Sequence, residues 1–201
     1  MPCSCPGPES RYRKALWIAL WVNLAMFVVE GVASIQSGSV ALMADAIDFF
    51  GDSANYVLSL SVLPMGMLWR GRAAWIKGAT MTLFGLGVWA RALWVLHSGA
   101  VPEPMTMGII GTLALVANLS VAAILFRYRQ GDADMRSVWL CSRNDAISNV
   151  AVLVAALGVF GTATAWPDLA VAVLMGSLAI SSGVSIVRHA QRDIRGALAA
   201  Q

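Results

Sequence analysis

Six long apolar runs limit what this chain can fold into. A helix needs about 20 mostly apolar residues to cross the hydrocarbon core of a bilayer, which is about 30 Å thick. Of the 201 residues, 58% are hydrophobic and 12% are charged, whereas soluble domains average about 45–50% apolar and about 25% charged. The sequence therefore predicts an all-α membrane protein with six transmembrane helices. The runs cover residues 15–35, 40–68, 73–96, 105–126, 138–160 and 169–187.

The basic residues predict how these helices are oriented. Twelve of the 14 Lys and Arg residues lie before the first run, around the second and fourth links, or after the sixth run, and the other three links contain none. Cytoplasmic loops carry the excess of Lys and Arg in membrane proteins. The distribution therefore predicts that both termini are cytoplasmic. The twelve residues are Arg11, Arg13, Lys14, Arg70, Arg72, Lys77, Arg127, Arg129, Arg136, Arg188, Arg192 and Arg195.

The apolar runs divide the chain into three segments. We expect a cytoplasmic N-terminal tail over residues 1–14, a six-helix transmembrane domain over 15–189 and a short basic cytoplasmic tail over 190–201. The first segment contains Cys3 and Cys5. Two interpretations of these cysteines stay open, namely reduced thiols of a disordered tail or a soft-metal site at the cytoplasmic entrance.

Gly and Pro residues mark the expected links between the helices. The segment Arg70-Gly71-Arg72 is expected to form the second link, and helix two is expected to end near Pro64. Pro167 suits the first turn of the last helix, where a missing backbone N–H costs nothing.

Acidic residues occur inside the second run, where they are expensive. An ionisable side chain at bilayer depth costs about 2.5–3.5 kcal/mol on insertion scales, so it is a functional candidate by default. Asp45, Asp48 and Asp52 follow a spacing of i, i+3, i+7, which places them on one face of a helix. Asn55 continues that face. The pattern predicts an oxygen-rich stripe on the second helix.

The fifth run carries a matching stripe. Ser142, Asp145 and Asn149 repeat the spacing i, i+3, i+7. At a rise of about 1.5 Å per residue, Asp48 and Asp145 each lie roughly 12 Å from the start of their helices, near the middle of the bilayer. If the two helices touch, we expect Asp48, Asp52, Asp145 and Asn149 to surround one divalent metal ion. Three carboxylates at such a site need either a cation or protons.

Several roles near this set stay open. Asp45 is an alternative to Asp48 as the residue that faces Asp145; otherwise it lines the exit path. Asn149 is either a ligand or a hydrogen-bonding residue between helices. Glu30, near the outer end of the first helix, is either exposed there or part of the exit path. Asn55 and Ser142 are candidates for support of the ligands or for the ion pathway.

The segment from Glu30 to Asp52 resembles the second span of the cation diffusion facilitator family. It contains a Ser-Gly-Ser turn around Gly38 and an Ala-Asp-Ala segment around Asp45. The family places its ligand pair ten and fourteen residues after the Gly of the turn, which implies Asp48 and Asp52 as metal ligands. The fifth span of the family carries His or Asp, three residues, and then Asp. This chain has Asp145 at the first of these positions and departs at the second, where it has Asn149.

The resemblance implies an integral protein of the bacterial inner membrane that exports a divalent metal ion in exchange for protons. The resemblance favours Zn²⁺, with Cd²⁺, Co²⁺ and Fe²⁺ as alternatives, and the all-oxygen donor set also suits Mn²⁺. The partners are then the lipid bilayer, the ion and protons, with no nucleic acid. The resemblance also identifies a short member without the usual cytoplasmic C-terminal domain. We expect no enzyme activity, because the two His residues lie at opposite membrane surfaces in the six-span arrangement. A metal-binding membrane subunit or sensor that does not transport is the alternative.

A homodimer would have to form through the transmembrane helices. Gly85, Gly87, Gly176 and Gly183 could allow two helices to approach closely. The same residues could instead pack helices within one protomer, and the sequence leaves both interpretations open.

Overall fold

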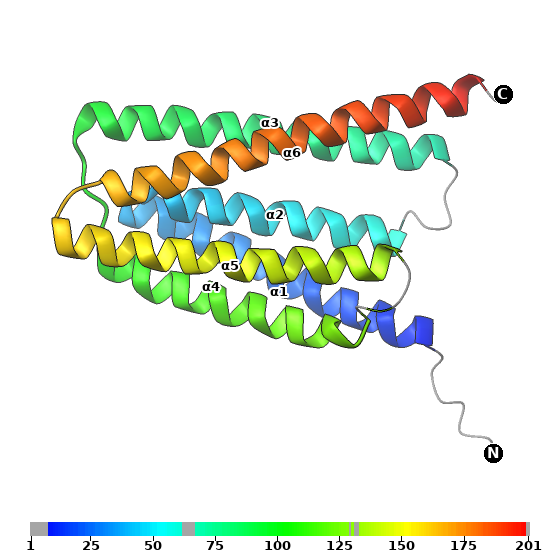
Figure 1. The fold of residues 1–201 in the computed structure, drawn as a ribbon, viewed down its shortest axis with the longest axis horizontal. Coiled ribbons are helices and arrows are strands. Elements are labelled where there is room, and N and C mark those ends of the chain that lie inside the picture. Colours follow the sequence, from blue (N-terminus) through cyan, green and yellow to red (C-terminus); the bar gives the residue numbers. More distant parts are fainter. Residues whose placement is uncertain (1–7, 62–66, 129, 131–132, 200–201) are drawn as a thin grey trace, which may run out of the picture.

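Six α-helices make up the computed structural model, which describes residues 8–61, 67–128, 130 and 133–199 (Figure 1). A short 3₁₀-helix, η1, follows α4 at Phe126–Tyr128. The predicted all-α fold is confirmed for these residues. Cys3, Cys5 and Pro64 lie outside them. The helices are α1 (Pro8–Ser37), α2 (Val40–Ser61), α3 (Met67–Ser98), α4 (Pro104–Leu125), α5 (Ala133–Thr162) and α6 (Trp166–Ala199).

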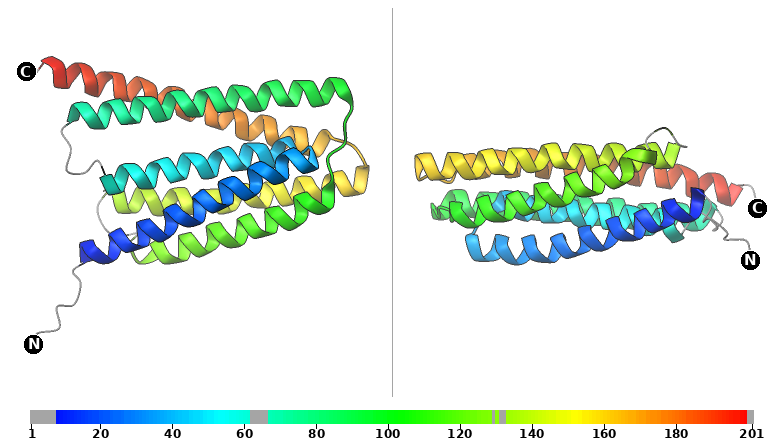
Figure 2. Two further views of the ribbon diagram at one scale, coloured as in Figure 1. Left: turned by 180° about the vertical axis from the view of Figure 1, so that it is seen from behind. Right: turned by 90° about the horizontal axis from the view of Figure 1, so that it is seen from below.

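The helices form one bundle in which α3 and α6 are a closely associated pair. Figure 1 and the left view of Figure 2 show these two helices side by side, and α1 also packs along α2 and α4 along α5. Helix α2 contacts α1, α3, α5 and α6, so it connects the pair to the rest of the bundle. Helix α1 begins and α6 ends at the same end of the bundle, which we call the terminal end (Figure 1). The opposite end, with the segments between α1 and α2, α3 and α4, and α5 and α6, is the far end.

Within the described part of the chain, five helices are long and apolar enough to cross a membrane. They contain the candidate spans Arg11–Ser37, Gly71–Ser98, Pro104–Tyr128, Asp145–Thr162 and Trp166–Leu198. Helix α2 has 22 residues, as many as α4, but three of them are aspartates. Six helices are thus observed, of which five satisfy the composition of a span. The assignment of α2 as a sixth span stays a prediction, as does the side of the membrane on which the termini lie.

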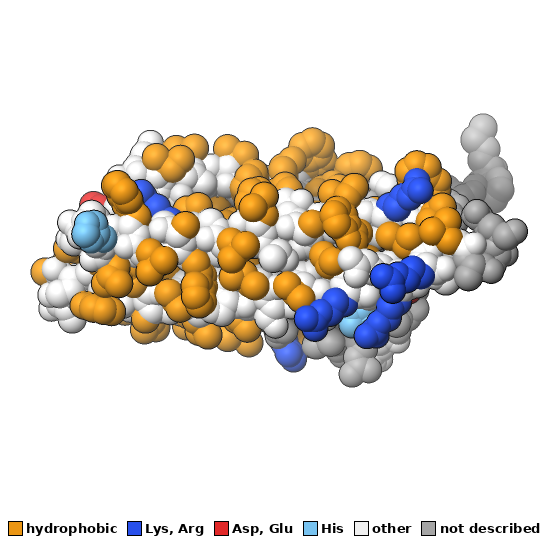
Figure 3. All heavy atoms as spheres, turned by 90° about the horizontal axis from the view of Figure 1, so that it is seen from above, with side chains coloured by type: hydrophobic (Ala, Val, Ile, Leu, Met, Phe, Trp, Pro, Cys, Tyr) orange, Lys and Arg blue, Asp and Glu red, His pale blue; other side chains and the backbone are white. Residues whose placement is uncertain are grey.

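The outer surface of the bundle is apolar in the way that a lipid-facing surface requires. Ile35 is 81% exposed, Phe160 75% and Leu157 72%, although a soluble protein rarely leaves many such side chains in a contiguous patch. Figure 3 shows hydrophobic side chains across the middle of one face, with Lys and Arg side chains gathered toward the terminal end. This distribution matches an integral membrane protein whose basic residues flank the apolar zone.

Glycines at intervals of seven residues bring α3 and α6 together. A Cβ atom on Gly78 would lie 2.7 Å from the backbone oxygen of Gly183, and one on Gly85 would lie 2.7 Å from Cγ1 of Ile180. A Cβ atom on Gly71 would lie 2.8 Å from Cγ1 of Ile194. The prediction of a link at residues 70–72 was therefore wrong, because Gly71 lies within α3 and serves close packing against α6 rather than a turn.

The same packing decides between the two interpretations of the other glycines. Gly85, Gly176 and Gly183 contact the opposing helix of the α3–α6 pair within this protomer, whereas a Cβ atom on Gly87 would meet nothing within 4 Å. Packing inside one protomer is thus confirmed for three of the four. Pro167 lies in the first turn of α6, as predicted.

Candidate metal centre

Helix α2 holds its three aspartates inside the bundle. Asp45 and Asp52 are buried, and Asp48 is partly buried. Asp48 lines a cavity of about 80 Å³ together with Ser148 of α5 and Ser182 of α6. The Met81 side chain of α3 also borders this cavity. Four helices therefore surround the space beside Asp48, and it offers a carboxylate and two hydroxyl groups.

Asp145 of α5 faces two of these acids. Its carboxyl group lies within hydrogen-bonding reach of both Asp48 and Asp52. Asn55 is also within side-chain hydrogen-bonding reach of Asp52. Since Asp48 and Asp52 are one helical turn apart, both can approach Asp145 from the same face of α2. The structure thus places Asp145 within reach of two other predicted ligands, with Asp48 rather than Asp45 beside it.

Asp145 lies close to Asp48 and close to Asp52, but the three carboxyl groups do not converge on one point. Among the residues that the structure describes, no three His, Cys, Asp or Glu side chains are grouped closely enough to hold a metal ion. Two carboxylates in contact repel unless a proton or a cation lies between them. The arrangement therefore supplies carboxylate oxygens that could converge on a divalent ion, but they do not already form a closed cage.

The fourth predicted ligand, Asn149, belongs to a second polar group. Its Nδ2 donates a hydrogen bond of 2.5 Å to Oδ2 of Asp45, and its Oδ1 accepts one of 2.8 Å from Nδ2 of Asn118. Asn149 is fully buried. This amide therefore joins α2, α4 and α5, which is the interhelical role that the sequence left open beside the ligand role.

Glu30 of α1 completes this second group. Its carboxyl group lies within interaction distance of the Asp45 carboxyl group. The side chain is 0% exposed, and neither carboxylate oxygen has a hydrogen-bond partner among the described residues. The alternative in which Glu30 is exposed at the outer end was therefore wrong for the folded protomer, because α1 packs this face against α2.

Lys77 lies closer to the acids than the sequence suggested. It interacts electrostatically with Asp48 and Asp52. The sequence groups it with the basic residues that flank a link, but α3 begins at Met67, ten positions earlier. At about 1.5 Å per residue, Lys77 is roughly 15 Å along its helix. Its position four residues beyond the apparent start of the third run gave no signal of this depth.

Ser142 lies one helical turn before Asp145 on α5 and contacts Tyr56 of α2. It is fully buried, and its hydroxyl group shares a 3.0 Å hydrogen bond with the hydroxyl group of Tyr56. This contact joins α5 to α2 toward the terminal end. Ser142 therefore supports the packing of the two acid-bearing helices, while its role in an ion pathway stays a prediction.

Asp168 is a buried polar residue whose contact with α2 the sequence reasoning missed. It lies in the first turn of α6, is 0% exposed, and accepts hydrogen bonds from the start of α2. The sequence offered only a Trp-Pro-Asp turn signal, which fits any helix start. The partner of Asp168 is 129 positions away in the chain, so the contact could not be read from local spacing.

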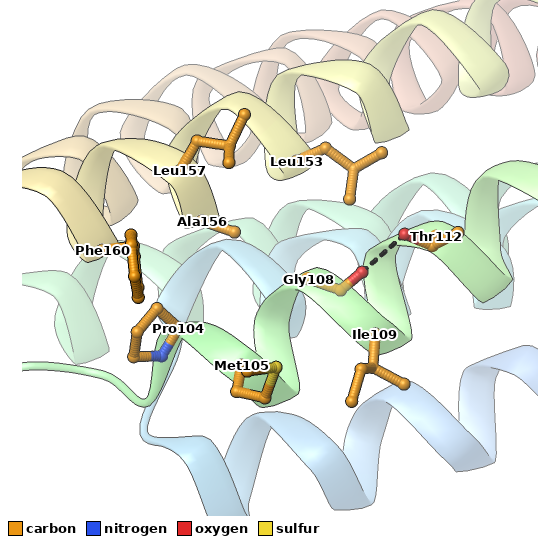
Figure 4. A pocket seen from close by; sticks show the side chains of 9 residues that line it. All are labelled: Pro104, Met105, Gly108, Ile109, Thr112, Leu153, Ala156, Leu157 and Phe160. Atoms are coloured by element: carbon orange, nitrogen blue, oxygen red, sulfur yellow. Dashed lines mark hydrogen bonds between the residues drawn. The ribbon is translucent and has the colours of Figure 1, made fainter.

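A larger groove lies between α4 and α5, away from the acids. Figure 4 shows its lining at the far end, where Phe160 and Pro104 stand close to each other and Leu157 and Leu153 line the α5 side. The groove has a volume of about 720 Å³ and is almost entirely apolar. Thr112 offers no free hydroxyl proton to it, because its Oγ1 donates to the backbone oxygen of Gly108 at 2.7 Å. This lining suits lipid chains rather than an ion.

Comparison with known proteins gives one family. Residues 16–66 and 73–194 match the cation efflux transmembrane domain. The chain is 24% identical to the metal cation efflux system protein CzcD of Cupriavidus metallidurans, over 85% of this chain and 57% of that protein. It is 22% identical to the cadmium, cobalt and zinc/H⁺-K⁺ antiporter of Bacillus subtilis, over 90% of this chain and 62% of the antiporter.

A zinc transporter from Escherichia coli, ZitB, is also similar. The identity is 22%, over 93% of this chain and 64% of the transporter. The chain thus spans about three fifths of the length of the curated relatives that it matches. The matched part contains both acid-bearing helices.

Proposed function

The chain belongs to the cation efflux family, and on this basis we propose that it exports a divalent metal ion across the membrane in exchange for protons. Proteins of this family are transporters rather than enzymes. The observation that carries the proposal is the approach of Asp145 on α5 to both Asp48 and Asp52 on α2. Three carboxyl groups in an apolar bundle, one of which lines a small cavity, are costly unless a cation or protons neutralise them.

The proposed ligands are Asp48, Asp52 and Asp145. Asn149 is proposed as a fourth ligand through Oδ1, which has a second lone pair besides the one used by Asn118. Because a carboxylate must be deprotonated to bind a metal ion, the ion and protons compete for the same oxygens. That competition would let a proton gradient drive release of the ion.

We propose Zn²⁺ as the transported ion. Zn²⁺ binds Asp oxygens at about 2.0–2.2 Å and accepts four ligands, and the names of two relatives include zinc. An all-oxygen set also accepts Mn²⁺, Fe²⁺ or Co²⁺, and Cd²⁺ is named for one relative. Asp45 and Glu30 are proposed to line the exit path, with Asn55 supporting Asp52.

The proposed arrangement in the membrane has six spans with both termini in the cytoplasm, in a bacterial plasma membrane. The three segments are a tail over 1–14, a transport domain over 15–189 and a basic tail over 190–201, although the helices themselves run from Pro8 to Ala199. A homodimer through the transmembrane helices is proposed with Gly87 as the glycine still open to a partner.

Uptake of Zn²⁺ into liposomes tests this function. Purified protein is reconstituted with an inward Zn²⁺ gradient and an opposing proton gradient, and Zn²⁺ is followed with a trapped fluorescent indicator. We expect transport by the wild type, its loss in the double variant Asp48→Asn, Asp52→Asn, and wild-type rates for Asp193→Asn, whose carboxylate is exposed on α6. Undiminished transport by the double variant would remove the proposed site. Binding of Zn²⁺ without transport would favour a metal-binding subunit or sensor.

A further inference from the structure

The start of α2 is held by a side chain from another helix. The carboxylate of Asp168, in the first turn of α6, accepts hydrogen bonds from the backbone N–H groups of Val40 at 2.8 Å and Ala41 at 3.1 Å. It also accepts one of 2.6 Å from the hydroxyl group of Ser39. Ser39 in turn accepts a bond of 3.0 Å from the N–H group of Leu42. All three backbone donors of the first turn of α2 are therefore satisfied.

This junction is sealed from its surroundings. Asp168, Val40 and Ala41 are each 0% exposed, and Ser39 is 2% exposed. A buried carboxylate is expensive unless donors and positive charge compensate it. Here the free N–H groups and the positive end of the α2 helix dipole supply both. The pairing is reciprocal, because without Asp168 two buried backbone donors would have no acceptor.

The polar groups farther along α2 make its rotation critical. Asp45 and Asp48 are three residues apart, which is about 300° around a helix with 3.6 residues per turn, so their side chains point only about 60° apart. Asp45 contacts Asn149, whereas Asp48 lies within reach of Asp145. A modest rotation of α2 would therefore exchange which acid faces Asp145. Three directional bonds to one carboxylate fix both the rotation and the axial position of the first turn.

We propose that Asp168 is a positioning residue for the ion site: by holding the start of α2, it sets which aspartates of that helix converge with Asp145. It does so without contacting the ion. At a rise of about 1.5 Å per residue, the proposed ligand Asp48 lies roughly 12 Å along α2 from Val40, which Asp168 contacts. The effect expected on Zn²⁺ affinity rests on the proposed function. The effect expected on the stability of the start of α2 rests on the hydrogen bonds of Asp168 alone.

The experiment compares four single variants in detergent. Asp168→Asn keeps the size of the side chain but replaces one acceptor oxygen by a donor amide that opposes the N–H groups of α2. Ser39→Ala removes one hydroxyl group and leaves the carboxylate on Val40 and Ala41. Glu103→Gln is the matched control, because Glu103 caps α4 in the same way, through Met105 at 2.9 Å and Thr106 at 2.5 Å, and α4 carries no acid. Val121→Ala, in a fully buried position on α4, controls for general loss of stability.

Two quantities are measured on monodisperse protein: the Kd for Zn²⁺, by competition with a fluorescent chelator, and hydrogen–deuterium exchange of peptides from α2. We expect Asp168→Asn to raise the Kd for Zn²⁺ at least about tenfold and to speed hydrogen–deuterium exchange over residues 40–48. Ser39→Ala should raise the Kd and speed this exchange to a smaller extent. Glu103→Gln should leave the Kd and the α2 peptides unchanged. Val121→Ala should lower the melting temperature without raising the Kd.

The outcomes separate the two proposals. Absence of Zn²⁺ binding by the wild type would defeat the proposed function, and exchange in α2 would still report on the junction. Slow, wild-type exchange at residues 40–48 in Asp168→Asn would overturn the positioning role. So would an unchanged Kd in that variant, or an equal rise in Val121→Ala. If Asp168→Asn does not fold, the graded response of Ser39→Ala against its two controls decides.

Discussion

Asn149 donates a 2.5 Å hydrogen bond from Nδ2 to Oδ2 of Asp45, and this bond ties α5 to the acid-bearing face of α2. The carbonyl end of the same amide is held by Asn118 of α4. An aspartate in place of Asn149 could not donate in the same way unless it were protonated. The amide therefore gives the buried Asp45 carboxylate a donor, where the related motif usually carries an Asp that could not donate when ionised.

The first prediction concerns this amide. Asn149→Asp removes the donor and sets a third carboxylate beside Asp45 and Glu30, so we expect a loss of stability of about 1–3 kcal/mol without metal. Zn²⁺ should then raise the melting temperature more than it does in the wild type, because a ligand that binds only the folded state stabilises it in proportion to its affinity. Thermal unfolding in detergent with and without Zn²⁺ measures both effects. An unchanged melting temperature without metal would show that the donor contributes nothing.

Proton competition should make the affinity for Zn²⁺ depend on pH. Each carboxyl group that binds the ion must first lose its proton, so the Kd should rise as the pH falls. Removing one titrating ligand with Asp145→Asn should make this negative slope of log Kd against pH shallower by about one. Competition with a chelator at several pH values gives the slope, and Asp193→Asn serves as the control. Equal slopes in Asp145→Asn and the wild type would exclude Asp145 as a proton-releasing ligand.

Lys77 should weaken cation binding at the acids that it faces. Its ammonium group attracts Asp48 and Asp52 and repels an incoming divalent ion. We expect Lys77→Met to strengthen Zn²⁺ binding by about fivefold, which corresponds to about 1 kcal/mol for a single ion pair. Lys14→Met, on the exposed face of α1, is the matched control. Weaker binding in Lys77→Met would mean instead that the lysine holds the aspartates in place.

The cap of α4 gives a pH effect that is separate from the ion site. Hydrogen bonds with Thr106 and then with Met105 hold the pKa of Glu103 below its ordinary value. A group with a lowered pKa in the folded state stabilises the fold above its unfolded pKa, and this contribution is lost as the pH falls through the folded value. Glu103→Gln should therefore lower the melting temperature at neutral pH, and the difference from the wild type should vanish in acid. A difference that persists in strong acid would argue against the cap.

The sequence predicted the elements of this fold better than their contacts. Apolar runs of about 20 residues located all six helices, because the bilayer sets their length. The i, i+3, i+7 stripes located the acids on α2 and α5, because a helix repeats its faces regularly. Link positions were less certain, since Gly71 reads as a turn residue when its packing partner on α6 is unknown.

The division of the acids into two groups could not be read from the sequence. Asp45 and Asp48 are both on the inner face of α2, and only the rotation of that helix decides which one meets Asp145. That rotation depends on contacts between residues far apart in the chain, such as Asp168 with Ser39. For the same reason the depth of Lys77 was missed, because the start of α3 was placed by composition.

The glycine contacts between α3 and α6 give the last prediction. A Cβ atom on Gly183 would lie 2.4 Å from Oγ1 of Thr82 and 2.7 Å from the backbone oxygen of Gly78, so Gly183→Ala must push the two helices apart. Overpacking of this kind costs about 1–3 kcal/mol. Gly87→Ala is the matched control, because on the same helix pair its Cβ atom would meet nothing within 4 Å.

Thermal unfolding and cross-linking together test this packing. We expect Gly183→Ala to lower the melting temperature. Gly87→Ala should not lower it, because alanine has a higher helix propensity than glycine and its Cβ atom meets no neighbour there. If Gly87 lies at a contact between two protomers, Gly87→Ala should instead reduce cross-linking of the reconstituted protein while its monomer stays stable. Equal melting temperatures for Gly183→Ala and the wild type would contradict the close approach of α3 and α6.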